Sequence, residues 1–238
     1  MLNKKSDKKF VYQGKDLESM SFANNYHQWI YDEIKSFTGT KIAEIGSGIG
    51  NFTQFLLQDN NAVIHAFEPC RKMHDASMHL NHKSVVSINE NFENLTSNHK
   101  GQFDSVVFIN VLEHIEDDKD ALEASMNIIR ENGHLIIFVP ALMSIYSAFD
   151  RFIGHFRRYR KSQLIKLVRD TGFTVNACKY FDSLGVIPWL IFMKLLGGSL
   201  NHRSVKIYDS YMVPLVKYLE SICSPPVGKN LLIVASKS

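Results

Sequence analysis

The sequence has few cysteines, little excess charge and no long uninterrupted apolar run. Its three cysteines, Cys70, Cys178 and Cys223, are far apart and odd in number. This excludes a disulfide framework and a cysteine-based zinc site, and favours reduced thiols. No apolar signal-peptide core follows Met1, so we expect a cytoplasmic protein. A net charge of +3 over 238 residues is too small to indicate a nucleic-acid-binding protein.

The most apolar stretch, residues 184–200, is interrupted by Pro188, Lys194 and the pair Gly197-Gly198. It is shorter than the roughly 20 apolar residues that a membrane span requires. The composition favours a buried helix or the cover of a pocket. Peripheral membrane contact through 184–200 is the alternative.

Short apolar runs alternate with helical patterns through the first part of the chain. Buried parallel strands have such nearly continuous apolar sequences, and their alternation with helices predicts a doubly wound parallel sheet. The predicted strands are Lys41–Ile45, Ala62–Phe67, Val85–Ile88, Ser105–Ile109 and His134–Val139, and the predicted helices are Phe52–Gln58, Cys70–Leu80 and Asp118–Ile129.

The chain reads as a single α/β domain with additions at both ends. Residues 1–38 form an N-terminal helical lid around the amphipathic stretch Phe22–Phe37. Residues 39–182 form the core. Residues 183–229 are far longer than a typical connection and predict a helical cap inserted before the last strand, 230–238.

A glycine-rich turn follows the first predicted strand. It reads Glu44-Ile45-Gly46-Ser47-Gly48-Ile49-Gly50 and leads into a helix. Glycines let the backbone adopt positive φ and approach a ligand closely, and open α/β sheets bind ligands at this edge. A dinucleotide fingerprint would need glycine where Asn51 stands, and no Gly-Lys-Ser/Thr P-loop is present. A nucleotide-dependent oxidoreductase and a non-catalytic binding protein remain alternatives.

Three later segments complete a pattern. Glu68 ends the second strand, the sequence FDSVVFINVLEHIEDD covers 103–118, and ENGHLIIFVP covers 131–140. With the glycine turn, they resemble the ordered motifs of class I S-adenosylmethionine-dependent methyltransferases. The stretch 149–161, FDRFIGHFRRYRK, resembles one found in a bacterial small-molecule subgroup of that family. The resemblance implies a Rossmann-like, seven-stranded sheet with an antiparallel last strand.

The resemblance also implies a site for S-adenosylmethionine. Glu68 would accept the ribose hydroxyl protons, and Asn110 would lie beside the transferable methyl. Asn91 stands where the family often has aspartate. The implied cofactor residues are Glu44, Gly46, Ser47, Gly48, Gly50, Glu68, Pro69, Asn91, Phe92, Asn110, Val111 and Tyr26.

Catalytic and substrate residues are predicted in the 149–161 stretch and after the fourth strand. His155, His114 and Tyr159 are the catalytic candidates, and His155, Arg158 and Tyr159 are the substrate-binding candidates. The alternative is a basic surface loop over 157–161 in which Asp150 pairs with one of the cations.

No metal site is predicted, because His79 and His82 lack a third ligand. The expected reaction is methyl transfer to an O, N or C nucleophile of a small, partly apolar or acidic molecule: a metabolite, glycan or lipid-linked precursor. No nucleic acid partner is expected, and the sequence does not indicate the oligomeric state.

Overall fold

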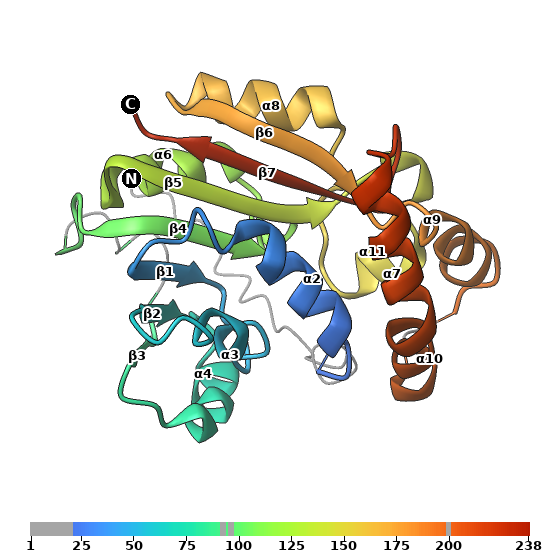
Figure 1. Ribbon diagram of the computed structural model, residues 1–238, viewed down its shortest axis with the longest axis horizontal. Coiled ribbons are helices and arrows are strands. Elements are labelled where there is room, and N and C mark those ends of the chain that lie inside the picture. The colour runs from blue at the N-terminus through green and yellow to red at the C-terminus, as the bar shows by residue number, and fades with distance from the viewer. Residues whose placement is uncertain (1–20, 91–93, 95–97, 199–200) are drawn as a thin grey trace, which may run out of the picture.

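A computed structural model describes residues 21–90, 94, 98–198 and 201–238. Its centre is a seven-stranded sheet with the strand order β3-β2-β1-β4-β5-β7-β6 (Figure 1). The strands are β1 Lys41–Ile45, β2 Val63–Phe67, β3 Val85–Ile88, β4 Phe103–Ile109, β5 Ile129–Pro140, β6 Thr174–Phe181 and β7 Asn230–Ser236.

Strand directions match those predicted. β1 is parallel to both β2 and β4, and β4 is parallel to β5. β7 lies between β5 and β6 and is antiparallel to each. Four residues of β1 and most of β4 and β5 are buried, which explains their almost continuously apolar sequences.

Helices cover both faces of the sheet. On one face, α6 (Asp118–Ile128) and α8 (Lys161–Asp170) pack their apolar side chains into one core cluster. On the other, α2 (Asn24–Ile34), α3 (Thr53–Leu56) and α11 (Val213–Ile222) contribute to a second. The doubly wound α/β prediction is therefore confirmed.

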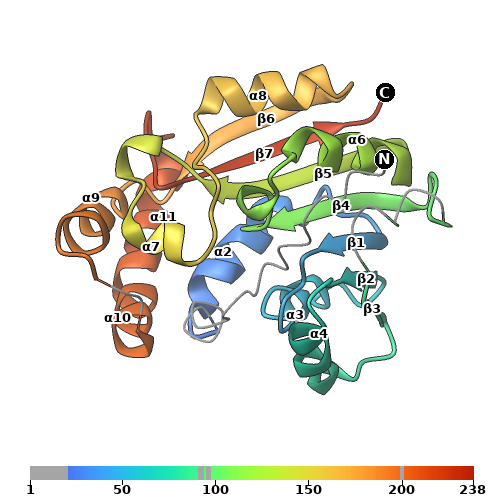
Figure 2. The same cartoon turned by 180° about the vertical axis from the view of Figure 1, so that it is seen from behind.

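The insertion before β7 is helical. It contains α9 (Val186–Pro188), the π-helical turn η5 (Trp189–Leu195), α10 (His202–Ile207), the π-helical turn η6 (Tyr208–Met212) and α11. Figures 1 and 2 show it beyond the carboxyl ends of β4 and β5, beside α2.

Two polar contacts fasten the insertion to α2. The carboxylate of Asp209 accepts hydrogen bonds from the backbone N–H groups of Asn25 (3.0 Å) and Tyr26 (2.8 Å). These are free N–H groups at the start of α2, where a carboxylate is favourable. Lys217 forms an ion pair with Asp32 at 2.7 Å.

Some element boundaries differ from those predicted. The helix predicted over 70–80 is α-helical only over α4 (Arg71–Ser77) and continues as the 3₁₀ turn η1 (Met78–Leu80). β5 begins at Ile129, five residues earlier than predicted, because Ile129 pairs with Phe103 across a register shift. No helix in the described ranges combines the length and the apolar character needed to cross a bilayer.

Candidate active site

The glycine turn connects β1 to α3 and is fixed to the end of β2. The backbone N–H groups of Gly46 and Ser47 both donate to the carbonyl oxygen of Phe67, at 2.8 and 3.1 Å. Gly46 has φ +68°, and a Cβ at this position would lie 2.7 Å from a methyl of Val111. Glycine is thus required twice here, for the left-handed backbone and for the close approach of Val111.

Glu68 joins the turn to β2. One carboxylate oxygen accepts a hydrogen bond from the N–H of Gly48 and the other from the N–H of Cys70, both at 2.8 Å. Burial raises the pKa of the Glu68 carboxyl group. The two hydrogen bonds lower it, but the effect of burial is larger. Each oxygen keeps a further lone pair for a hydroxyl donor. The carbonyls of Glu68 and Pro69 accept from the amide of Asn89.

Glu44 lies beneath the turn and is 3% exposed. The hydroxyl of Thr53, at the start of α3, donates to its carboxylate at 2.6 Å. Burial raises the pKa of Glu44 to about 8, because an ionised carboxylate away from water loses its hydration. The group becomes favourable as an anion only when a cation or further donors approach it.

Asn110 lies directly after the carboxyl end of β4. Its φ is +54°, a strained conformation that asparagine tolerates better than most residues. Its N–H donates to the carbonyl of Phe138 at 2.8 Å, and Val111 follows it toward Gly46. Asn91 and Phe92 lie outside the described residues.

Tyr26 is placed apart from the glycine turn. Its hydroxyl lies 3.1 Å from the amide oxygen of Asn230, and its ring packs against Trp29, Phe138 and Phe181. None of these partners belongs to the turn.

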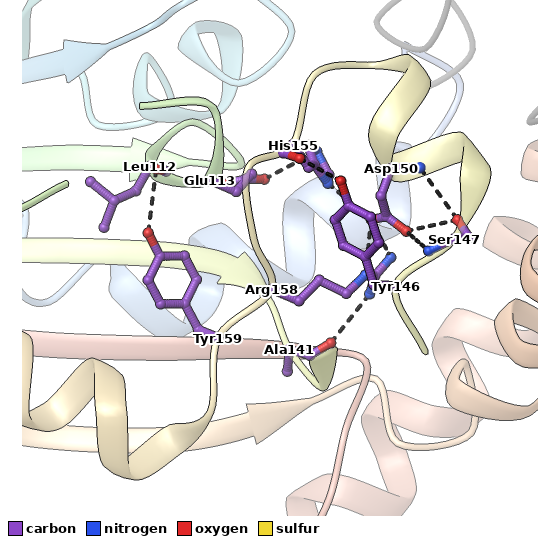
Figure 3. A network of polar contacts seen from close by, with 9 residues as sticks. All are labelled: Leu112, Glu113, Ala141, Tyr146, Ser147, Asp150, His155, Arg158 and Tyr159. Atoms are coloured by element: carbon purple, nitrogen blue, oxygen red, sulfur yellow. Dashed lines mark hydrogen bonds and ion pairs between the residues drawn. The ribbon is translucent and has the colours of Figure 1, made fainter. Parts of the chain in front are cut away.

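The 149–161 stretch builds a buried network around Asp150 (Figure 3). The Asp150 carboxylate is 2.9 Å from Nδ1 of His155 and 2.8 Å from Nε of Arg158. It also accepts from the N–H and hydroxyl of Ser147, in a capping box that begins α7 (Ala148–Phe152). Despite burial, these partners lower the pKa of Asp150 to about 2.

Arg158 is almost completely buried. Besides Asp150, its guanidinium donates to the carbonyl of Ala141 at 3.2 Å and lies over the ring of Trp189. The alternative prediction was that Asp150 pairs with one of the cations of 157–161. That cation is Arg158. Arg157 instead contacts Asp118 at 2.6 Å.

The other ring nitrogen of His155 points toward Glu113. Nε2 of His155 is 3.7 Å from Oε1 of Glu113, which belongs to the 3₁₀ turn η3 (Leu112–His114) after β4. Glu113 is fully buried, and burial raises its pKa to about 7. The rings of His114 and His155 are 4.6 Å apart, edge to face, and burial lowers the pKa of His114 to about 3.

Tyr159 holds the loop to the core. Its hydroxyl lies 2.8 Å from Asp118 and 3.3 Å from the carbonyl of Leu112. Its backbone exchanges hydrogen bonds with Pro140 and Leu142. Burial raises the pKa of Tyr159 well above its ordinary value.

The structure thus forms two groups of side chains at the carboxyl edge of the sheet. One contains Glu44, the glycine turn, Glu68 and Val111. The other contains His114, His155 and Arg158, together with Glu113 and Asp150, which were not predicted as site residues. Their sequence signals were a glutamate four residues after the end of the fourth strand and the Ser-x-x-Asp capping box.

A surface cavity of about 590 Å³ lies elsewhere and includes none of the predicted site residues. It is lined by Leu142, Met143, Ser144, Arg160, Lys161, Ser162, Ile165 and Tyr180.

Several solved structures share this fold. A SAM-dependent methyltransferase from Thermotoga maritima aligns over 94% of this chain and 95% of its own, with 16% identity and a TM-score of 0.64. One from Archaeoglobus fulgidus aligns over 93% and 99%, with 15% identity and a TM-score of 0.61. The 1,6-didemethyltoxoflavin-N1-methyltransferase of Burkholderia thailandensis, solved with bound 1,6-didemethyltoxoflavin and S-adenosylhomocysteine, aligns over 94% of this chain and 82% of its own, with 13% identity and a TM-score of 0.60.

No protein of curated function matches the sequence significantly. A family model described as a methyltransferase domain matches residues 21–177, which include the glycine turn, Glu68 and the whole network around Asp150. The chain therefore belongs to the methyltransferase family, as an S-adenosylmethionine-dependent enzyme of the Rossmann-like class.

Proposed function

We propose that this methyltransferase acts on an O, N or C nucleophile of a small, partly apolar molecule. The observation that carries the proposal is the apolar surface of the insertion beside the carboxyl edge of the sheet. In segment 186–196 the side chains of Ile187, Phe192, Leu195 and Leu196 are each more than half exposed. An exposed apolar surface of this kind suits contact with an apolar ligand or a lipid surface.

The cofactor site is proposed around the glycine turn. When bound, S-adenosylmethionine supplies an electrophilic methyl group on a sulfonium. The free lone pairs of Glu68 accept the two ribose hydroxyls, and Glu44 pairs with the ammonium of the methionine moiety. The buried Glu44 carboxylate fits this group because burial raises its pKa, and a neighbouring cation favours the charged form.

The pairing of Arg158 with Asp150 favours an apolar methyl acceptor over an acidic one. Arg158 was the predicted binder of an acidic substrate, but Asp150 and the carbonyl of Ala141 already engage its guanidinium. A buried, neutralised arginine has little attraction left for a further anion. The acceptor is therefore held mainly by apolar contacts with the insertion.

His155 orients or deprotonates the acceptor. Asp150 fixes Nδ1 of the imidazole and thereby directs Nε2 toward Glu113. Positioning and exclusion of water account for most of the acceleration, because the sulfonium is already a good leaving group.

The test is transfer of radioactive methyl groups from S-adenosylmethionine to fractionated cell extracts. After reaction, water and chloroform–methanol separate polar from apolar products. We expect enzyme-dependent label in the organic phase, and none with Glu68→Ala. Label confined to the aqueous phase would contradict an apolar acceptor. A wild-type protein that binds S-adenosylhomocysteine but labels neither phase would contradict the proposed acceptor class.

A further inference from the structure

Three potential metal ligands meet behind the tip of β4. Glu113 and His114 come from η3, and His155 comes from the loop after α7. One ligand atom of each lies within 4.8 Å of those of the other two. Segments about forty residues apart thus converge on one point, and the contact of Glu113 with His155 is visible in Figure 3.

We propose that Glu113, His114 and His155 bind one divalent transition-metal ion. Two imidazoles and one carboxylate are ligands that Zn²⁺, Co²⁺ and similar ions accept, whereas Mg²⁺ prefers oxygen ligands alone. In a tetrahedral site with bonds of about 2.1 Å, ligand atoms lie roughly 3.4 Å apart. The three groups need to close by only about 1 Å around the ion.

The environment of Glu113 is the first observation in favour. Its side chain is completely buried, yet neither carboxylate oxygen has a hydrogen-bond partner on another described residue. A buried carboxylate without such partners is costly. The contrast with Asp150, which has Ser147, His155 and Arg158 as partners, leaves Glu113 with unused capacity as a ligand.

The orientation of the His114 and His155 imidazoles is the second observation in favour of the metal site. Asp150 holds Nδ1 of His155 at 2.9 Å, which leaves Nε2 on the side of Glu113. The ring of His114 forms a hydrogen bond with the backbone of Gly154. Metal-binding histidines characteristically use their second nitrogen in this way, which fixes the tautomer and the ring direction.

The site also has a place in the proposed reaction. Glu113 follows Asn110 by three residues, so the ion would lie close to the end of β4, near the position proposed for the transferable methyl. Three protein ligands leave at least one coordination position open. Resting on the proposed function, this inference assigns that position to an oxygen or nitrogen atom of the methyl acceptor, and His155 then orients the acceptor through the ion and does not deprotonate it.

The experiment uses the tag-free, full-length protein after chelator treatment, titrated with Co²⁺. Visible d–d absorption reports the coordination geometry, and competition with Zn²⁺ gives the relative affinity. The variants are Glu113→Gln and His155→Gln. The control is the double substitution His79→Gln/His82→Gln, which removes two exposed histidines outside the cluster. Circular dichroism and S-adenosylhomocysteine binding without metal establish that each variant is folded.

We expect one equivalent of Co²⁺ with a low-symmetry spectrum, at least tenfold weaker binding in each cluster variant, and unchanged binding in the control. No stoichiometric binding, or binding lost only in the control, would overturn the site and leave the Glu113–His155 contact as a structural ion pair. Failure of the metal site with intact S-adenosylhomocysteine binding would leave the proposed methyl transfer standing. Loss of both would overturn both.

Discussion

The carboxylate of Glu68 accepts a hydrogen bond from the backbone N–H of Gly48 at 2.8 Å. The end of β2 thereby fixes the centre of the glycine turn before any ligand arrives. The same side chain is the proposed partner of two ribose hydroxyls, so it combines a structural with a binding role.

Substitution of Glu68 separates these roles. Hydrogen bonds to a charged group contribute about 1.5–3 kcal/mol each, so Glu68→Ala should weaken S-adenosylhomocysteine binding by at least tenfold. Glu68→Gln keeps one acceptor oxygen and should retain part of the affinity. Calorimetric titration measures both, with NAD as the negative control. Equal affinity in wild type and Glu68→Ala would contradict the assignment.

The raised pKa of Glu44 leads us to expect that a proton is released when the cofactor binds. Its pKa is raised to about 8, so the empty protein holds it largely protonated at pH 7. Pairing with the ammonium favours the carboxylate, and about one proton should leave. Calorimetry at pH 7 in buffers of different ionisation enthalpy measures that number. Glu44→Gln should release none, and an unchanged release in this variant would contradict the role.

The same pKa predicts a pH-dependent stability. The folded value, about 8, exceeds the ordinary 4.5, so the contribution of Glu44 is fully present below pH 4.5 and is lost as the pH rises toward 8. Relative to Glu44→Gln, the wild type should lose stability between pH 5 and pH 8, by on the order of 3 kcal/mol or less. Urea unfolding of both proteins at both pH values tests this, and a constant difference would refute it.

Removing Asp150 should be costly. Its carboxylate is the ion-pair partner of Arg158 at 2.8 Å, and both side chains are buried. Asp150→Ala leaves an unpaired buried cation and should destabilise the fold by about 3–5 kcal/mol. The double variant Asp150→Ala/Arg158→Met should recover part of that loss. Urea unfolding of the two single variants and the double variant completes the cycle, and strictly additive effects would exclude coupling of the pair.

Gly46 and Gly101 form a matched pair. Both have positive φ, but a Cβ at Gly46 meets Val111 at 2.7 Å, whereas nothing lies within 4 Å at Gly101. Gly101→Ala should cost about 1 kcal/mol for backbone strain alone. Gly46→Ala should cost about 1–3 kcal/mol more because of overpacking, and Val111→Ala should relieve part of it. Thermal unfolding ranks the variants, and equal losses would contradict the packing argument.

The sheet could be predicted because its strands carry their own signal. β1, β4 and β5 are buried and therefore apolar along most of their length. The glycine turn and Glu68 could likewise be placed from their order in the sequence, because parallel strands end at one edge.

The buried polar network could not be predicted in the same way. Glu113 was not among the predicted site residues, and only the fold shows that it is completely buried against a histidine about forty residues later. Arg158 was predicted to bind substrate, with pairing of Asp150 to one of the cations of 157–161 as the alternative, and only the fold shows that Arg158 is that partner. Contacts between residues far apart in the sequence leave no local pattern, whereas the apolar pattern of a buried strand can be recognised within a few residues.

The position of β7 has a consequence for synthesis on the ribosome. Among the strands that the structure describes, β6 pairs only with β7, which separates it from β5. A nascent chain that has already displayed every predicted cofactor residue still has β6 unattached and the edge of β5 open until residues 230–236 emerge from the exit tunnel. Open strand edges are prone to wrong pairing. The C-terminal half of the sheet can therefore be completed only after the insertion has been translated.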